Sequence, residues 1–305
     1  MVKILGVGGV CIDQLAVVPR MPKWDDVEHI SRYMMQQGGI VATAMVAAAR
    51  LGEPTEFIGG IGDDDAGQYA LKHFEQEQVE AKRVSIIEQA HTAFSFVLVH
   101  EKTGKRTIIH HRGVQRLAAL PLPPLDLTGI EFLHLDGYWI ETALQTARQA
   151  KTLGITTIID PSSICIHKTP QNEELLTLMD YIVPGAGFAT AFTHKTQPAE
   201  TAKVFLQYGC KAVILTNGEQ GCLVFTQDGH DHIPAFPVST VDTTGAGDTF
   251  HGAFVAGLSK GYPLLKAVQF ASAVAALKCT KLGGQSGIPT FQETQEFLAE
   301  RGVTL

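Results

Sequence analysis

The chain has 305 residues, of which 45% are hydrophobic and 18% are charged, so it can bury a large core and does not have the composition of a disordered protein. Its formal net charge of -7 argues against a nucleic-acid partner, because phosphate backbones are bound by clustered lysine and arginine. The sequence contains no uncharged apolar run long enough for a transmembrane helix, so we expect no membrane partner.

Apolar runs of strand length alternate with helical patterns along most of the chain. The first apolar run covers residues 2–10, and Asp13 ends it too early for a signal peptide, so we expect a buried first strand. An alanine-rich helix is predicted over residues 42–51. Further buried strands are predicted over residues 132–135, 155–159, 182–183 and 212–215, with helices over residues 141–153, 173–179 and 199–208 between them and an apolar helix over residues 263–279 near the end.

These strands are continuously apolar rather than alternating, as expected for strands that are buried on both faces. A parallel sheet covered by helices on both sides has this property. The sequence therefore predicts an α/β fold with a doubly wound, mostly parallel sheet flanked by helices.

Two segments depart from this alternation of buried strands and helices, and they predict a small β-lid. Residues 94–99 and 106–110 are rich in strand-forming side chains and flank a short turn, which is typical of a hairpin. We interpret residues 12–37 and 92–112 as lid insertions in a single domain that spans residues 1–305. A small sheet buries its apolar face poorly by itself, so we expect a homodimer that forms through the lids.

The cysteine and histidine patterns give no sign of a disulfide framework or of zinc. The cysteines are odd in number and have no C-x-x-C spacing, which favours a reduced, cytoplasmic protein. The pair His110 and His111 lacks a third convergent ligand, so we expect no zinc site there. The five cysteines are Cys11, Cys165, Cys210, Cys222 and Cys279.

The strongest motif is V-D-T-T-G-A-G-D-T-F over residues 241–250, between a β-prone segment at 232–238 and a helix rich in small residues. Glycines at such a junction let backbone N–H groups point outward together, and the helix dipole makes the site attractive to phosphate. Asp248 would stand in the first helical turn, where a base for phosphoryl transfer is needed. By itself, the pattern also fits an ordinary acid at a helix start.

The complete string D-T-T-G-A-G-D-T-F resembles the C-terminal signature of the ribokinase-like (PfkB) carbohydrate kinases. The family's N-terminal signature appears in the expected order, as Gly38-Gly39, an alanine-rich helix, and F-I-G-G-I-G-D-D-D-A-G over residues 57–67. The resemblance covers nearly the whole chain. Within the family, residues 42–52 and 270–289 look most like sulfofructose kinase, with ketohexokinase and ribokinase further off. It implies a kinase that transfers the γ-phosphoryl group of ATP to a hydroxyl of a sugar or sugar derivative.

The resemblance also implies roles for individual positions. The base would be Asp248, and the anion hole would be the backbone of Gly245, Ala246 and Gly247. The residues expected to bind the sugar are Asp13, Asp25 or its neighbour Asp26, Gly38, Gly39, Thr43, His110 and Arg112. The residues expected to bind ATP are Thr216, Gly218, Gly221 and Thr243 along the phosphates, and Val238 and Ala275 around the adenine. A monovalent cation such as potassium would be held by oxygen atoms of Asp242, Thr244, Cys279 and Gly284.

Simpler interpretations remain open for several of these positions. Asp13 could be a turn former at a strand end, and Asp25 a solvated loop acid. Gly218 and Gly221 could belong to a plain hairpin turn, and Val238 to ordinary core.

The sequence also departs from the family pattern. Many members have asparagine at the position of Thr43, and the N-x-x-E element that helps to position magnesium should fall at residues 185–188, which read G-A-G-F. We therefore expect Mg²⁺ to arrive on ATP, without an identified protein ligand. The missing element leaves a non-catalytic regulator that binds sugar or nucleotide as one alternative. Aromatic side chains in the lid, Trp24, Tyr33 and Phe96, leave a nucleoside kinase as another.

The identity of the substrate depends in part on a basic cluster at the end of the lid. Arg112 follows two histidines, and its fork-shaped guanidinium suits a carboxylate, sulfonate or phosphate group. The alternative is a solvated strand end at which Arg112 meets one of the chain's excess acids. The sequence alone does not name the sugar.

Overall fold

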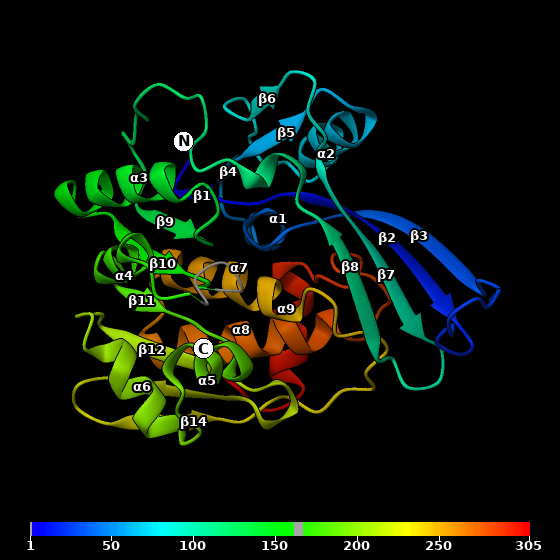
Figure 1. Cartoon of the computed structure of the whole chain (residues 1–305). Helices are drawn as coiled ribbons and strands as arrows, with labels where there is room; N and C mark the ends of the chain where they lie inside the picture. The colour runs from blue at the N-terminus through cyan, green and yellow to red at the C-terminus, as the bar shows by residue number, and fades with distance from the viewer. Residues whose placement is uncertain (1, 162–166) are drawn as a thin grey trace.

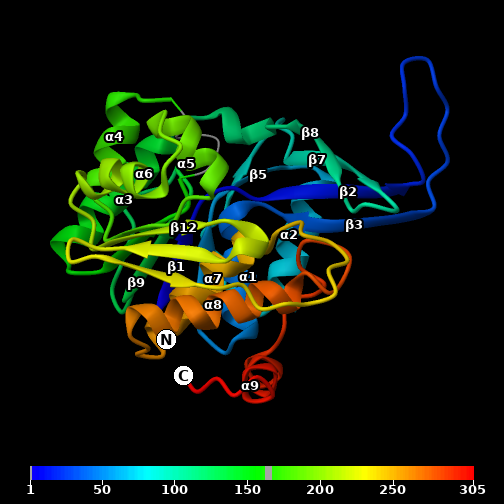
Figure 2. The same ribbon diagram turned by 90° about the horizontal axis from the view of Figure 1, so that it is seen from below.

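The computed structural model describes residues 2–161 and 167–305, so Cys165 lies outside the described residues. Within these ranges a large sheet carries helices on both faces, and a smaller sheet projects from one side (Figures 1 and 2). This arrangement confirms the predicted α/β class with a doubly wound sheet. The described cysteines are all free of disulfide bonds. In the same ranges, no helix has the length and apolar character needed to cross a bilayer.

The large sheet has the strand order β14-β13-β12-β11-β10-β9-β1-β4 in the described residues. The strand pairs β4–β1, β1–β9, β9–β10, β10–β11 and β11–β12 are parallel. The pairs β12–β13 and β13–β14 are antiparallel. The predicted strand segment at 232–238 ends early, because Pro234 has no N–H for the ladder. The strands are β1 (Ile4–Val7), β4 (Thr55–Ile58), β9 (Phe132–Leu135), β10 (Thr156–Ile159), β11 (Tyr181–Ile182), β12 (Ala212–Thr216), β13 (Cys222–Phe225) and β14 (His230–Ile233).

Two hydrophobic cores lie on the two faces of this sheet. On one face, α7 packs so closely on α1 that a Cβ atom added to Gly252 would lie 2.1 Å from the carbonyl oxygen of Ala44. The helices on this face are α1 (Ile40–Arg50), α2 (Asp65–Gln76), α7 (Ala246–Ser259), α8 (Leu264–Lys278) and α9 (Phe291–Ala299). Those on the other face are α3 (Ile140–Thr152), α4 (Pro170–Thr177), α5 (Ala186–Thr193) and α6 (Pro198–Leu206).

The smaller sheet forms the lid and has the order β3-β2-β7-β8. One side of it encloses a small apolar cluster, whereas Tyr33, Phe96 and Ile109 are exposed. The loop between β2 and β3 projects away from the body (Figure 2). The lid strands are β2 (Cys11–Val18), β3 (Arg32–Gly38), β7 (Ala93–His100) and β8 (Arg106–His111), and the remaining short elements are β5 (Gly60–Gly62), β6 (Ser85–Ile87), η1 (Gly113–Arg116) and η2 (Gly218–Gln220).

The predicted first strand over residues 2–10 is wrong in its extent. β1 ends at Val7, and the chain enters the lid as β2 from Cys11. The break lies at Gly8, where an added Cβ atom would be 2.4 Å from Oδ2 of Asp136, so only glycine lets the backbone pass this carboxylate. Asp13 therefore belongs to a lid strand rather than to the end of the first strand of the core.

Candidate active site

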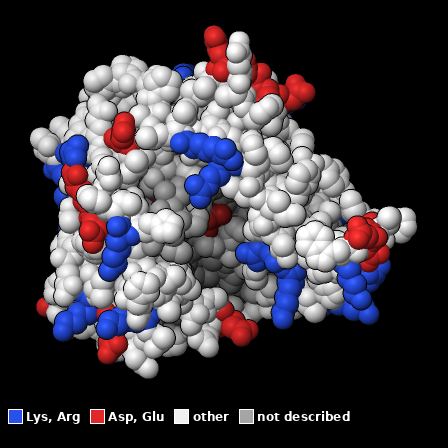
Figure 3. Space-filling model, viewed as in Figure 1, with Lys and Arg blue, Asp and Glu red and all other residues white. Residues whose placement is uncertain are grey.

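A hollow between the lid and the body opens on the face shown in Figure 3, with acidic side chains inside it and basic side chains around its rim. The carboxyl ends of the parallel strands of the large sheet meet at one edge, which is where ligands bind in open α/β sheets. Asp136 follows β9 directly and Asp160 follows β10 directly, and these two strands are neighbours. Both residues were missed at the sequence level.

The motif at residues 242–250 forms the entry to α7. Gly245 is the N-cap and has φ 71°, in the left-handed region that favours glycine. An added Cβ atom at this position would also lie 2.7 Å from the carbonyl oxygen of Gly284. Gly247, in contrast, has no heavy atom within 4 Å of an added Cβ, so open space lies beside it. The N–H of Ala246 donates to the carbonyl oxygen of Thr243 at 3.2 Å, so this donor already has a partner within the loop.

Asp248 lies in the first turn of α7 and is half-buried. Burial raises its pKa well above the usual range of an aspartate, and the negative charges of Asp160, Asp13 and Asp136 raise it further. The positive charge of Lys278 opposes this shift. A carboxylate in this environment holds a proton strongly, which is the property of a general base once the group is ionised.

Asp13 reaches the same carboxylate cluster from lid strand β2. An added Cβ atom on Gly38, in the paired strand β3, would lie 2.2 Å from Oδ2 of Asp13, so the lid backbone fits closely around this side chain. Burial raises the pKa of Asp13, while hydrogen bonds from Ser95 and Cys11 and the charge of His110 lower it in part. The predicted residues Asp13, Gly38 and His110 thus lie together, because the ring of His110 is 3.0 Å from the hydroxyl of Ser95.

Asp136 is completely buried at the end of β9. Its Oδ2 accepts a hydrogen bond from the N–H of Gly9 at 2.8 Å, and its Oδ1 accepts one from the N–H of Tyr138 at 2.9 Å. Burial nevertheless raises its pKa to about 7. An acid directly after a buried strand was the available signal, but the same pattern is common in turns.

Asp160 also contacts a histidine of α7. Nε2 of His251, which lies one turn after Asp248 on α7, is 3.2 Å from Oδ2 of Asp160. The ring of His251 stacks on that of His134, with centroids 5.1 Å apart. Burial lowers the pKa of both histidines, and the neighbouring His251 lowers that of His134 further.

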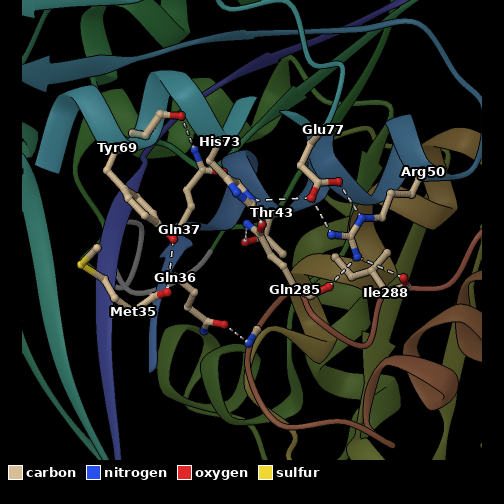
Figure 4. A network of polar contacts seen from close by, with 12 residues as sticks. Met35, Gln36, Gln37, Thr43, Arg50, Tyr69, His73, Glu77, Gln285 and Ile288 are labelled. Atoms are coloured by element: carbon tan, nitrogen blue, oxygen red, sulfur yellow. Dashed lines mark hydrogen bonds and ion pairs between the residues drawn. The ribbon is translucent and has the colours of Figure 1, made fainter. Parts of the chain in front are cut away.

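Other predicted sugar residues have different surroundings. Asp25 is exposed in the projecting β2–β3 loop, away from the cluster around Asp248. Thr43 is buried, and its hydroxyl accepts a hydrogen bond from the amide of Gln285 at 3.1 Å (Figure 4). Gly39 has φ 102° and closely approaches Gly9, which explains its requirement for glycine. Arg112 is exposed directly after β8. Burial raises the pKa of Tyr138, and the nearby positive charge of Arg112 offsets a part of this shift.

The polar network around Thr43 ties the base of the lid to the body. Oε1 of Gln36 in β3 accepts from the N–H of Gly284 at 2.9 Å. Arg50 of α1 donates to Glu77 and to the carbonyl oxygen of Gln285, at 2.7 Å in each case (Figure 4). Sequence analysis did not identify this network, which fixes the 279–288 segment against α1, α2 and β3.

The predicted nucleotide residues lie on several elements, and Thr216, Gly218 and Gly221 lie together at the end of β12 and around η2. Thr216 ends β12 and pairs with Gly185, so the G-A-G-F segment at the start of α5 borders this loop without supplying a carboxylate. No heavy atom lies within 4 Å of a Cβ atom added to Gly218. A Cβ atom added to Gly221 would lie 2.2 Å from the carbonyl oxygen of Ile233, so close packing by itself explains that glycine. Val238 and Ala275 are partly buried, and both pack on the hydrophobic core that contains α1, α7 and α8.

A lid residue also contacts the loop before α7. The guanidinium of Arg106, at the start of β8, donates to Oγ1 of Thr243 at 2.9 Å. Both residues are exposed. The contact joins the lid to a predicted ATP-binding residue.

Among the predicted cation ligands, Asp242 is buried and hydrogen-bonds to Thr244 and to the carbonyl oxygen of Cys279. Its Oδ1 accepts hydrogen bonds from the N–H and hydroxyl of Thr244 at 2.9 and 2.8 Å, and its Oδ2 accepts one from the N–H of Gly283 at 2.8 Å. Burial by itself would raise the pKa of Asp242, but these hydrogen bonds outweigh it and lower the pKa. Lys278, which sequence analysis missed, donates to the carbonyl oxygen of Asp242 at 3.0 Å. Across residues 2–161 and 167–305, no group of three or more His, Cys, Asp or Glu side chains is arranged to hold a metal ion.

Comparison with known proteins identifies the family. The model of the pfkB family carbohydrate kinases matches residues 1–291. The chain is 30% identical over 302 residues to the ribokinase of Haemophilus influenzae (95% of this chain, 96% of that protein), and 29% identical over 307 residues to the ATP-dependent ribose-1-phosphate kinase of Halopiger xanaduensis (99% of each). The crystal structure of a ribokinase from Thermotoga maritima, 30% identical, superimposes with a TM-score of 0.83 over 98% of this chain and 100% of that one. The chain therefore belongs to the pfkB family and is a carbohydrate kinase.

Proposed function

We propose that this carbohydrate kinase transfers the γ-phosphoryl group of ATP to a hydroxyl of a sugar or sugar derivative, with Asp248 as the general base. The observation that carries the proposal is the placement of Asp248 in the first turn of α7, directly after the open backbone position at Gly247. Two similar proteins are named as a ribokinase and as an ATP-dependent ribose-1-phosphate kinase, which supports both the phosphoryl donor and the type of acceptor.

The reaction would use the two sides of the hollow. Asp13 on the lid would hold the sugar by hydroxyl groups, and Asp248 on the body would accept the proton of the attacking hydroxyl. The N-terminus of α7 directs backbone N–H groups and the positive end of the helix dipole toward the transferred phosphoryl group. Closure of the lid would exclude water, which competes with the sugar for that group.

ATP would lie along Thr216, Gly218 and Thr243, with its adenine between Val238 and Ala275. Mg²⁺ would be bound mainly by the phosphates, to neutralise the charge that moves during transfer. The residues at the start of α5 offer it no carboxylate, so the ion would keep water ligands on that side.

The acceptor would carry an acidic group if Arg112 takes part in recognition. Arg112 is exposed at the end of β8, and among the described residues no carboxylate lies within ion-pair distance of it. An acidic sugar would therefore supply the partner that the chain does not.

The decisive experiment is a screen of ATP consumption over neutral sugars, sugar phosphates, sugar acids and nucleosides, with phosphorylated products identified by mass spectrometry. Turnover of a sugar or sugar derivative supports the proposal, and turnover of nucleosides alone contradicts it. Arg112→Ala sharpens the result, because it should raise KM for an acidic sugar far more than for its neutral analogue. An unchanged preference in the variant would remove Arg112 from recognition.

The exposed apolar face of the lid supports a homodimer. Tyr33 and Ile109 are each 60% exposed, and Phe96 is 44% exposed. Two lids packed face to face would cover these side chains. Light scattering of the purified protein should give twice the chain mass, and Ile109→Lys should shift it toward the monomer. A monomer at micromolar concentration in the wild type would contradict this assembly.

A further inference from the structure

Lys278 is an unusual residue for its position. It is the last residue of α8, its exposed fraction is 0%, and its neighbours along the helix are almost all apolar. A lysine is almost never fully buried without a partner, because removal of the ammonium group from water is costly. Its Nζ atom donates to the carbonyl oxygen of Asp242 at 3.0 Å. The ammonium group is thus directed at the loop that leads into α7.

The same loop is where the family resemblance predicts a monovalent cation, and two of the predicted oxygen ligands there already accept hydrogen bonds. The carbonyl oxygen of Asp242 already accepts from the ammonium group of Lys278. The carbonyl oxygen of Cys279 accepts the N–H groups of Val241 and Asp242, at 2.8 and 3.2 Å. A potassium ion at this place would compete with these donors for two of the four predicted ligands, and it would lie beside a buried positive charge.

We infer that the ammonium group of Lys278 replaces the monovalent cation and holds residues 242–245, and with them the entry to α7, in the shape that binds phosphate. An ammonium group carries the same charge as potassium and is similar to it in size. Burial lowers the pKa of Lys278 and the charge of Arg106 lowers it further, while the negative charges of Asp242 and Asp248 oppose this shift and favour the ammonium form. Lys278 is a positioning residue, since its contact is with the loop and not with the substrate.

Two consequences follow for the enzyme. ATP binding and turnover are independent of potassium in the wild type, because the ammonium group of Lys278 already occupies the position of the ion. The catalytic carboxylate is also affected, because the positive charge of Lys278 partly offsets the repulsion that Asp248 receives from Asp160 and Asp13. A residue that only packed the end of α8 would have neither consequence.

The experiment compares the wild type with Lys278→Met, which has a similar length and no charge. Lys266→Met is the matched control, because Lys266 lies on the same helix and is exposed. For each protein, ATP affinity is measured by calorimetry and the unfolding midpoint by scanning calorimetry, in potassium chloride, ammonium chloride and tetramethylammonium chloride at equal ionic strength. Turnover of the sugar found by the substrate screen is measured in the same salts.

The wild type and Lys266→Met should give the same ATP affinity and unfolding midpoint in all three salts. Lys278→Met should bind ATP roughly tenfold or more weakly in tetramethylammonium chloride, and potassium or ammonium should restore most of the loss by occupying the vacated position. Recovery of both ATP affinity and turnover in Lys278→Met would show that a free monovalent cation can replace the charge of the lysine, as the inference requires.

Three results would overturn the inference. The first is a severalfold gain in ATP affinity or turnover of the wild type with potassium, which can be observed even if the variant does not fold. The second is a folded Lys278→Met variant with wild-type affinity in tetramethylammonium chloride. The third is a loss in that variant that no monovalent cation reverses. The inference rests on the proposed kinase function, but the binding and unfolding measurements need no acceptor, so a wrong acceptor class would leave them interpretable.

Discussion

The loop before α7 and the β-lid face the same hollow but are held in place very differently. In the loop, the buried side chain of Asp242 accepts three hydrogen bonds and its carbonyl oxygen accepts a fourth from Lys278. The lid encloses only a small cluster of buried apolar side chains, Leu15, Val17, Val97 and Val99, and most of β8 is exposed. Few buried contacts mean low local stability, so the lid is the part expected to move and the loop the part that stays fixed.

This difference separates two tasks of the enzyme. Asp248, the proposed base, and the backbone proposed to bind phosphate lie on the fixed part, where geometry has to be accurate for phosphoryl transfer. Asp13, His110 and Arg112 lie on or beside the lid, where a change of side chain alters the substrate with little effect on the core. Substitutions on the fixed part should therefore impair ATP binding or lower kcat, and substitutions in the lid should mainly raise KM.

The largest effect on the fixed part is expected from Gly245→Ala. The new Cβ atom would lie 2.7 Å from the carbonyl oxygen of Gly284 in a backbone with φ 71°. We expect roughly 1–3 kcal/mol less stability and a loss of about 100-fold or more in kcat/KM, because the strained loop would misplace Asp248. Gly247→Ala is the contrast, since nothing lies within 4 Å of its added Cβ. Gly247→Ala should keep its stability, measured by urea unfolding, and lose ATP affinity, measured by calorimetry. Equal behaviour of the two variants would contradict the different roles given to Gly245 and Gly247.

A second test uses the pH dependence of the carboxylate cluster. Asp248 has to be ionised to accept a proton, and its pKa is raised, so kcat/KM should fall with decreasing pH at a higher pH than an ordinary aspartate would give. Asp160→Asn removes one source of repulsion and lowers the pKa of Asp248. The acid limb of the pH profile should then move to lower pH. Asp228→Asn, in an exposed turn, is the control, and an acid limb that is identical in all three proteins would refute the electrostatic account.

The smallest effect is expected where lid and loop touch. Arg106→Ala removes the hydrogen bond to Thr243, which is exposed to solvent. A single hydrogen bond of this kind contributes about 0.5–1.5 kcal/mol, so KM for ATP should rise by roughly two- to tenfold with kcat nearly unchanged. Lys105→Ala, next to it and also exposed, should have no effect. A fall in kcat without a change in KM would mean that the contact serves the fixed part instead.

The sequence predicted the fold class because buried strands and helices have clear periodic patterns, and it predicted the family because two motifs stand in order. It placed Asp13 incorrectly at the end of the first strand. That strand ends earlier because Gly8 closely approaches Asp136, and a contact between segments so far apart in the chain is not visible in the sequence. Asp136 and Asp160 were missed because only the parallel pairing of β9 and β10 brings their ends together. Lys278 was missed because an apolar helix pattern does not reveal which neighbour receives a lone charge.

The central claim, that Asp248 is the base, is tested most directly by single-turnover phosphoryl transfer with Asp248→Asn. The substitution keeps the shape of the side chain and removes its ability to accept the proton. ATP affinity by calorimetry should stay near that of the wild type, while the rate of transfer to the sugar should fall by roughly 10²–10⁴-fold. A variant that binds ATP normally and keeps more than half of the wild-type rate would show that another group removes the proton.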